Sequence, residues 1–153
     1  MDLEEYLRAH KVEYRIIDKT ETVHTADAAA ATGIPLEKIT KSLIFVADGR
    51  PVAVVIPGTC KVNTQKLRSV LKAENVRLVP FEEAEQYSGY PPGGTPPLHY
   101  KNVSKIVIDK KVADQDLIYG GGGSRNKLLE LKTIDLLRLN GGLVADVAES
   151  RTK

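Results

Sequence analysis

The chain has 153 residues, a length that predicts one domain over residues 1–153 with a sizeable hydrophobic core. Hydrophobic residues make up 42% and charged residues 27%, and 22 Lys and Arg against 20 Asp and Glu leave a formal charge of +2. So small a charge does not indicate a nucleic-acid-binding protein by itself, and it gives no reason to expect a DNA partner.

Cysteine content and hydropathy predict the location of the protein. Cys60 is the only cysteine, which excludes an internal disulfide framework and predicts an intracellular, cytoplasmic protein. No apolar run is long enough to span a bilayer, and the acidic first residues are not typical of a secretory leader. We therefore expect no membrane partner.

In chain order, the first predicted elements are a helix and a strand. Leu3, Tyr6 and Leu7 fall at helical spacing and predict a short amphipathic helix over residues 1–10. Residues 12–17 are typical of a strand.

An Ala-rich helix and a hairpin come next. Thr25 is a good N-cap for this helix, and Gly33 is the residue at which we expect it to end. Residues 39–57 predict two strands joined at Asp48 and Gly49, because Asp-Gly between apolar runs is a strong hairpin signal.

A further helix begins at Asn63 or Thr64, and Leu67, Val70 and Leu71 form its buried stripe. The later elements are a strand over 76–79, a helix over 80–89, strands over 105–109, 117–119 and 127–132, a helix around 135–139 capped by Thr133, and an apolar segment over 143–147. Residues 150–153 are expected to be frayed. Helices and strands without a strict βαβ rhythm predict the α+β class, a mixed sheet with helices packed on it.

The loop Gly89–Asn102 is unusual because it holds four prolines and three glycines in fourteen residues. Flexible linkers use Gly with Ser, and rigid spacers use Pro without Gly. The mixture indicates a backbone held in a fixed shape, with amide groups left uncovered for a ligand to approach.

The glycine tract 120–123 lies between two predicted strands. No Gly-Lys-Ser/Thr follows it, so it is not a Walker loop, and it lacks the strand–glycine–helix order of a dinucleotide fingerprint. A wide turn between strands and a bare surface for ligand approach both fit this tract.

The reactive side chains leave little choice of chemistry. His10, His24 and His99 are scattered and no HExxH or CxxC spacing occurs, so neither a metal nor another cofactor is expected. Cys60 fits a buried, inert thiol, and no GxSxG elbow is present. An enzyme built on this sequence must therefore use backbone dipoles, a lysine and water.

Lys41 is the lysine that the pattern singles out. On a strand it shares one face with Leu43 and Phe45. A lysine at a strand end can extend along the sheet edge to water or point into a cleft, and both interpretations stay open at this point.

A set of short motifs occurs in one order between His24 and Val147. They are the Ala-rich helix ending at Gly33, Lys41-Ser42-Leu43, the helix start Val62–Leu67, Ser88-Gly89-Tyr90, the loop Gly93–Leu98, the turn Gly122-Gly123, and Asp135-Leu136. With these motifs the chain resembles the YbaK/prolyl-tRNA-synthetase editing-domain family, the aminoacyl-tRNA deacylases.

The resemblance implies a mixed, strongly curved sheet surrounded by helices. It implies trans-editing, the hydrolysis of the ester that links a wrong amino acid to a mischarged tRNA, best known for tRNA(Pro) charged with Cys or Ala. The alternatives on the same fold are a non-catalytic tRNA- or nucleotide-binding module and a regulatory partner of an aminoacyl-tRNA synthetase. Monomer and homodimer are both open.

The resemblance also implies site residues. It places Lys41 at the substrate and makes Gly94 and Thr95 the catalytic part of a loop whose amides stabilise the oxyanion. A water, helped by a ribose hydroxyl of the tRNA, is the expected nucleophile. The other residues expected to bind substrate are His24, Gly93, Pro96, Pro97, His99, Gly121, Gly122 and Gly123.

The chain departs from the family pattern in three places, which involve four residues. Asn63 stands where relatives usually carry Asp, and His99 stands where Gly is frequent. Gly120 and Gly121 replace a bulkier residue and a Ser. We expect Gly121 to leave a pocket wall open, and His99 either to narrow the entrance or to hydrogen-bond the loop.

Several cations crowd the helix after Asn63 and flank the Pro/Gly loop, and we expect some of them to contact phosphates of the tRNA acceptor stem. The alternative is an ordinary solvated helix face. These residues are Lys61, Lys66, Arg68, Lys72, Lys101 and Lys105.

Overall fold

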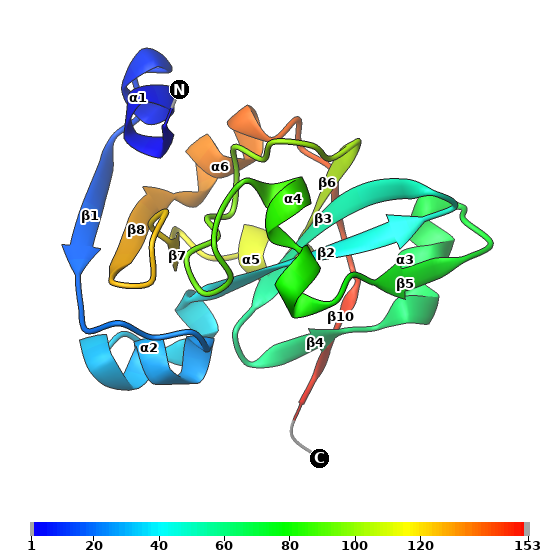
Figure 1. Ribbon diagram of the computed structural model, residues 1–153, viewed down its shortest axis with the longest axis horizontal. Helices are drawn as coiled ribbons and strands as arrows, with labels where there is room; N and C mark the ends of the chain where they lie inside the picture. The colour runs from blue at the N-terminus through cyan, green and yellow to red at the C-terminus, as the bar shows by residue number, and fades with distance from the viewer. Residues whose placement is uncertain (1, 152–153) are drawn as a thin grey trace.

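The computed structural model describes residues 2–151, and its elements are drawn in Figure 1. The α-helices are α1 (Leu3–Ala9), α2 (Thr25–Thr32), α3 (Thr64–Leu71), α4 (Glu85–Ser88), α5 (Lys110–Ala113) and α6 (Thr133–Leu139), and the 3₁₀ helices are η1 (Leu36–Lys38) and η2 (Phe81–Glu83). The strands are β1 (Tyr14–Asp18), β2 (Thr40–Ala47), β3 (Arg50–Pro57), β4 (Cys60–Val62), β5 (Val76–Leu78), β6 (Lys105–Asp109), β7 (Leu117–Gly121), β8 (Lys127–Lys132), β9 (Val144–Ala145) and β10 (Ala148–Ser150).

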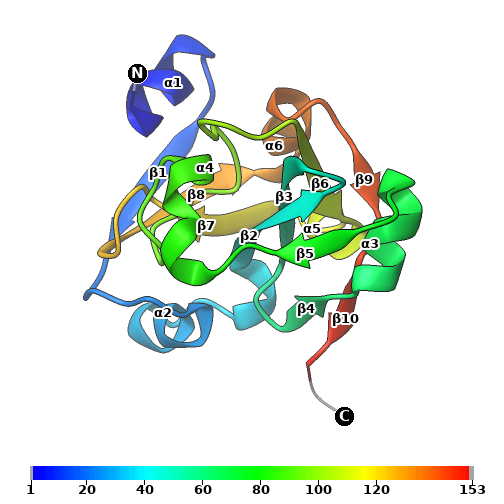
Figure 2. The ribbon, with the colours of Figure 1, turned by 45° about the vertical axis from the view of Figure 1, so that its right-hand side comes forward.

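The strands form a mixed sheet and two smaller antiparallel sheets (Figure 2). The five-stranded sheet has the order β5-β2-β3-β6-β9, in which β2 and β3 are antiparallel and β3 and β6 are parallel. The other sheets have the orders β1-β8-β7 and β10-β4. A parallel bridge between Ile39 and Tyr119 links the start of β2 to β7. The predicted α+β class with a mixed sheet is therefore confirmed.

Two apolar cores hold the helices to the sheets. On one side, Leu7 of α1 and Leu136 of α6 pack with Leu129 of β8, and all three are fully buried. On the other side, Leu67 of α3 packs against the five-stranded sheet with Phe45 of β2. Burial of a side chain of this size contributes about 1.5–3 kcal/mol to folding.

Most predicted elements are present, and several of their terminal signals are confirmed. Asp48 and Gly49 both have positive φ, 47° and 82°, as a tight hairpin turn between right-twisted strands requires. The Asn63 side chain accepts a hydrogen bond from the Lys66 amide and caps α3. Gly33 ends α2 in the left-handed conformation.

The two predicted threonine caps are wrong. His24 occupies the N-cap position of α2 and makes no side-chain capping bond, so Thr25 is the first helical residue. Lys132 precedes α6 in the same way, and the buried Thr133 hydroxyl has no hydrogen-bond partner among the described residues. Each helix starts one residue earlier than predicted, because the extended backbone typical of an N-cap is found at His24 and Lys132 and not at the threonines that follow them.

Four elements, η1, β4, α5 and β10, had no counterpart among the predicted ones. Strand β10 pairs with β4 over Ala148–Ser150, so Ser150 is ordered and the predicted fraying is wrong for it. The amide of Arg151 donates to the Thr59 carbonyl at 3.3 Å. Residues 152 and 153 lie outside the described residues. Among the helices of residues 2–151, none is long and apolar enough to cross a membrane.

Asp109 fixes the C-terminal strand to the sheet. This carboxylate is 1% exposed and accepts hydrogen bonds from the amides of Lys111, Val147 and Ala148, at 3.0, 2.9 and 3.0 Å. A buried carboxylate is tolerated because these bonds replace its hydration. Through β10, the same residue determines where Arg151 lies.

We expect Asp109→Ala to lower the free energy of unfolding by roughly 3 kcal/mol, because it leaves buried amides without an acceptor. Asp146→Ala is the matched control. It removes only an exposed pair with Lys66, at 3.1 Å, which typically contributes less than about 1 kcal/mol. Urea denaturation of both variants measures the difference, and equal stabilities would show that Asp109 is not an anchor.

Candidate active site

A cleft of about 760 Å³ opens between α2, the edge of β2, η2 and the Pro/Gly loop. Strand β5 pairs with β2 only over Phe45–Ala47, so the first half of β2 has no strand partner on that side within the described residues. This open edge, Thr40–Ile44, lines the cleft. Exposed strand edges offer backbone groups and side chains to a ligand.

Lys41 extends from this edge into the cleft wall and is half-buried. Burial, and to a smaller extent the positive charge of Arg151, lower the pKa of the Lys41 ammonium below its usual value. Within residues 2–151, no ion pair or hydrogen bond holds this ammonium. Two cations beside one cleft, with no carboxylate partner among residues 2–151, make this cleft electropositive and suited to an anionic ligand.

Side-chain hydrogen bonds hold the carbonyl groups of the Pro/Gly loop, one from Tyr100 of the loop itself and others from Ser42 of β2 and Asn140 after α6. The Pro96 carbonyl accepts hydrogen bonds from Tyr100 Oη at 2.8 Å and Ser42 Oγ at 3.2 Å. Burial raises the pKa of the Tyr100 hydroxyl, which keeps it a donor. The Pro97 carbonyl accepts from Asn140 Nδ2 at 2.9 Å. The loop shape is therefore set before any ligand arrives.

The loop amides differ in their availability. The Gly94 amide donates to the Pro91 carbonyl at 2.9 Å and closes a turn, so it is not free to bind an oxyanion. Within the described part of the chain, the amides of Gly93 and Thr95 have no acceptor, and both residues line the cleft. The predicted role of Gly94 as a donor is thereby corrected: Gly94 shapes the loop.

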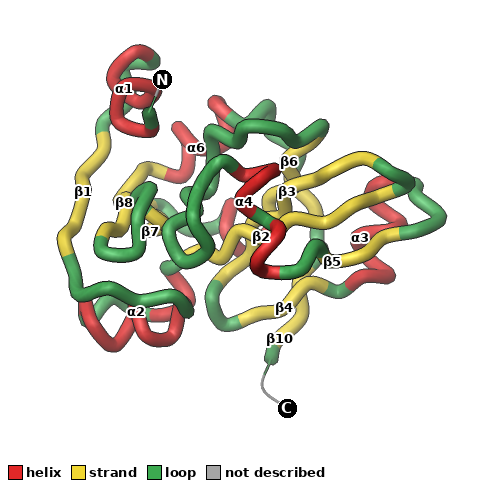
Figure 3. The backbone as a smooth tube through the Cα atoms, viewed as in Figure 1, coloured by secondary structure: helices red, strands yellow, loops and turns green. Residues whose placement is uncertain are grey.

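The loop lies directly on the glycine tract (Figure 3). A Cβ added to Gly94 would stand 2.8 Å from the backbone of Ser124, and one added to Gly121 would stand 2.4 Å from the Thr95 carbonyl oxygen. The predicted open wall at Gly121 is therefore wrong. The space beside this residue is filled by the loop backbone, and glycine is required for that approach.

Residues 20–139 match the family model of the aminoacyl-tRNA editing domain. The chain belongs to this family. It is 32% identical over 114 residues to the proline–tRNA ligase of Nitratidesulfovibrio vulgaris strain Hildenborough, covering 73% of this chain and 20% of the ligase. For the proline–tRNA ligase of Geobacter metallireducens the identity is 32% over 139 residues, covering 88% and 24%. The editing domain thus spans about a fifth to a quarter of the length of these relatives.

Solved structures show the same fold. The hypothetical protein APE2540 matches with a TM-score of 0.88 and 34% identity, over 95% of this chain and 98% of that chain. A protein described as "a putative trans-editing enzyme for prolyl tRNA synthetase" matches with a TM-score of 0.79, over 90% and 87%. At 24% identity, this second likeness shows the fold alone.

The editing-domain cleft brings together part of the predicted site. His24, Lys41, Gly93, Thr95 and Gly121 all line it. The other predicted loop and turn residues do not line it; these are Gly94, Pro96, Pro97, Gly122 and Gly123.

His99 does not narrow the entrance. Its ring stacks on Tyr6 of α1 at a centroid distance of 4.4 Å, and its Nδ1 shares a hydrogen bond with Tyr90 Oη at 2.6 Å. Burial lowers the pKa of His99 and raises that of Tyr90 to about 12. His99 therefore holds α1 on the loop, in agreement with the second of its two expected roles.

The cations predicted to bind RNA lie outside the cleft, on α3 and in neighbouring segments. Lys61 forms an exposed ion pair with Glu149 at 4.0 Å, and Lys66 pairs with Asp146. Arg68, Lys72 and Lys101 are exposed or half-exposed, and no carboxylate of residues 2–151 pairs with them. The last three therefore remain the stronger candidates for phosphate contacts.

Among the cleft residues that sequence reasoning missed, three are charged or aromatic. Arg151 reaches it from the end of the chain, Phe81 from the start of η2, and Lys19 from the segment after β1. The Lys19 ammonium donates to Thr22 Oγ1 at 2.6 Å and is therefore structural. No local pattern marks Arg151 or Phe81, since both reach the cleft through tertiary packing.

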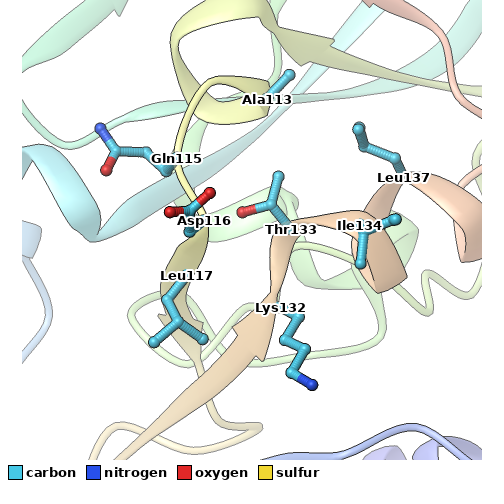
Figure 4. Close-up of a pocket in the computed structure, with 8 residues that line it drawn as sticks. All are labelled: Ala113, Gln115, Asp116, Leu117, Lys132, Thr133, Ile134 and Leu137. Atoms are coloured by element: carbon cyan, nitrogen blue, oxygen red, sulfur yellow. The ribbon is translucent and has the colours of Figure 1, made fainter.

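A second hollow, of about 560 Å³, lies between α5, β7 and α6 (Figure 4). Apolar side chains, among them the exposed Ile134, form much of its lining. None of the residues predicted for the site lines it. The chemistry suggested by the sequence is thus confined to the first cleft.

The contact between the loop and Gly121 generates a prediction. We expect Gly121→Ala to lower the free energy of unfolding by roughly 3 kcal/mol, because the new methyl group meets backbone that cannot move independently. Gly33→Ala is the control, since its Cβ meets nothing within 4 Å and adds only the cost of φ +75°. Thermal and urea unfolding compare the two, and equal losses would contradict the close packing at Gly121.

Proposed function

We propose that the chain is an aminoacyl-tRNA deacylase that hydrolyses the ester bond of a mischarged tRNA in trans. The observation that carries this proposal is the half-buried Lys41, unpaired within residues 2–151, in one cleft with the free amides of Gly93 and Thr95. Family membership supports the reaction class. Relatives that are proline–tRNA ligases make Cys- and Ala-tRNA(Pro) the first substrates to test.

In this mechanism the ester carbonyl lies against the loop. The oxygen of a water attacks the carbonyl carbon, the ester C–O bond breaks, and the ribose oxygen takes up a proton as it leaves. The amides of Gly93 and Thr95 stabilise the oxyanion that forms between these steps. The loop is already held by Tyr100, Ser42 and Asn140, so little reorganisation opposes the reaction.

Lys41 supplies the charge in this proposal. Its ammonium contacts a phosphate or the ribose of the terminal nucleotide and fixes the ester beside the loop. Its incomplete hydration strengthens that contact, because a charge in a partly buried site is screened less than one in water. No protein nucleophile is required, since an aminoacyl ester is already activated, and Cys60 is buried.

A non-catalytic module that binds a tRNA end would use the same cleft, and a regulatory partner of a synthetase would use the surface. The amides of Gly93 and Thr95, which have no acceptor among residues 2–151, support catalysis in this proposal, because unpaired donors beside the cleft can stabilise an oxyanion.

One experiment separates these functions. The protein is incubated with a panel of tRNAs charged with matched and mismatched amino acids, Cys- and Ala-tRNA(Pro) among them, and the surviving ester is measured against time. Loss of ester from a mischarged tRNA, with the matched Pro-tRNA(Pro) spared, supports the proposal. Stability of every ester in the panel contradicts it.

We expect Lys41→Ala and Lys41→Met to lower kcat/KM for deacylation by about 10² or more, as removal of a transition-state contact does. Neither variant should be less stable than the wild type, because the ammonium is desolvated and lies near Arg151. Lys38→Met, an exposed lysine of η1, is the control for loss of one charge. Deacylation by either Lys41 variant at the wild-type rate would remove Lys41 from the mechanism.

The proposed RNA contacts also make a prediction. Charge reversal of Arg68 and Lys72 together should weaken tRNA binding, and it should reduce the slope of log affinity against log salt by about one for each phosphate that is no longer bound. Lys11→Glu, in the turn after α1 and distant from α3 in Figure 1, is the control. Fluorescence anisotropy at several salt concentrations measures the slope. An unchanged slope in the double variant would place the RNA elsewhere.

A further inference from the structure

Two nearly parallel aromatic rings line the cleft. His24, just before α2, and Phe81, at the start of η2, have ring centroids 6.4 Å apart and planes that differ by 21°. Successive bases in a stack are about 3.4 Å apart, so a base between two rings needs about 6.8 Å. The 6.4 Å between the two centroids is close to this value.

Neither ring has another evident role in the described residues. Phe81 is 50% exposed and belongs to none of their buried core clusters, and the His24 side chain makes no capping bond to α2. Leu78, 54% exposed, extends the apolar surface beside Phe81 on the same cleft wall. Large apolar side chains this exposed, gathered at a cleft, are typical of binding surfaces.

The support of Phe81 allows a small opening. Element η2 has three residues, and Pro80 precedes it in an extended conformation. A 3₁₀ turn of this length is weakly held, so a displacement of a few tenths of an ångström to admit a base is inexpensive. The fixed φ of Pro80 holds the backbone where it enters η2, so a displacement of Phe81 would pivot at Pro80.

The charges of the cleft indicate which aromatic group belongs there. Lys41 and Arg151 line the same cleft as the two rings, and no carboxylate within residues 2–151 pairs with Lys41. A ligand that carries both a flat ring and a phosphate, as a nucleotide does, can satisfy the rings and the cations at once.

We propose that His24 and Phe81 form an aromatic clamp that stacks on both faces of the terminal adenine base of the tRNA. This inference rests on the proposed function, which puts an aminoacylated tRNA end in the cleft. The clamp fixes the base, Lys41 and Arg151 hold the phosphate side, and the ester then reaches the amides of Gly93 and Thr95. Phe81 is in this view a positioning residue.

The test is a double-mutant cycle between protein and RNA. Two forms of uncharged tRNA(Pro) are prepared, one with its terminal adenine and one with an abasic terminal residue. Their affinities for wild type, Phe81→Ala and Phe81→Trp are measured by fluorescence anisotropy. Removal of the base should weaken binding to wild type and to Phe81→Trp roughly tenfold, as loss of one stacked base does, and should weaken binding to Phe81→Ala markedly less, because only His24 remains to stack on the base.

Kinetics provide a second measurement. Removal of a contact made equally in the ground state and the transition state raises KM without changing kcat, so Phe81→Ala should raise KM for a mischarged tRNA about tenfold with kcat within about threefold. Ile134→Ala is the control, since Ile134 is 74% exposed and lies in the hollow of Figure 4 outside the cleft. This variant should show wild-type values in both experiments.

The outcomes separate the clamp from the proposed function. Equal losses for both RNAs in Phe81→Ala, no loss for either, or no measurable affinity of the wild type for either RNA would overturn the clamp. If the wild type deacylates while the base and Phe81 are not coupled, the function stands and the clamp is wrong. If the coupling is found without deacylation of any tRNA, the clamp stands as a nucleotide-binding site and the deacylase proposal fails.

Discussion

The contact on which the site depends is backbone against backbone, between the Pro/Gly loop and the glycine tract. Gly94 lies on Ser124 and Gly121 lies on Thr95, with no room for a Cβ at either glycine. Side chains take part as well: Pro97 packs against Gly120, and Arg125 Nε donates to the Pro92 carbonyl at 2.8 Å, so main-chain contact and side-chain bonds together set the position of the loop relative to β7. Strand β7 is bridged in turn to the start of β2, and this places the loop beside the open strand edge and its lysine.

The two cations in the cleft lower the stability of the folded state, and an anionic ligand that binds them would restore it. Lys41 is half-buried near Arg151, and burial and repulsion both disfavour its ammonium. Asp109, although distant in sequence, contributes to this arrangement, because its bonds to Val147 and Ala148 hold the strand that ends next to Arg151. The cations of the cleft thus lower the stability of the fold, and the hydrogen bonds of the buried Asp109 carboxylate help to offset this loss. Functional sites commonly reduce stability in this way while other parts of the fold compensate.

Local patterns predicted what depends on neighbours in sequence. Helical spacing, the turn at Asp48 and Gly49, and the cap at Asn63 all involve contacts within a few residues. Strand β10 escaped prediction because its pairing with β4 joins segments that are distant in the chain. The prediction for Gly121 was wrong for the same reason: a missing side chain indicates close approach, but only the fold shows whether a ligand or another loop makes it.

The departures from the family pattern therefore concern the scaffold more than the choice of amino acid. His99 adopts φ +65°, a conformation that glycine takes readily, and its ring contacts Tyr6 and Tyr90 away from the cleft. In the proposed deacylase, with His99 and Gly121 assigned to support, apolar side chains of the cleft wall, among them those of Ala28, Ile39 and Leu128, are the groups available to contact a small substrate residue. An apolar wall of this kind separates residues that differ by a methylene by only about 1–3 kcal/mol. In the proposed function, strong discrimination between amino acids must then depend on the position in which the loop and the terminal nucleotide hold the ester. The backbone contact that positions the loop would therefore also influence specificity.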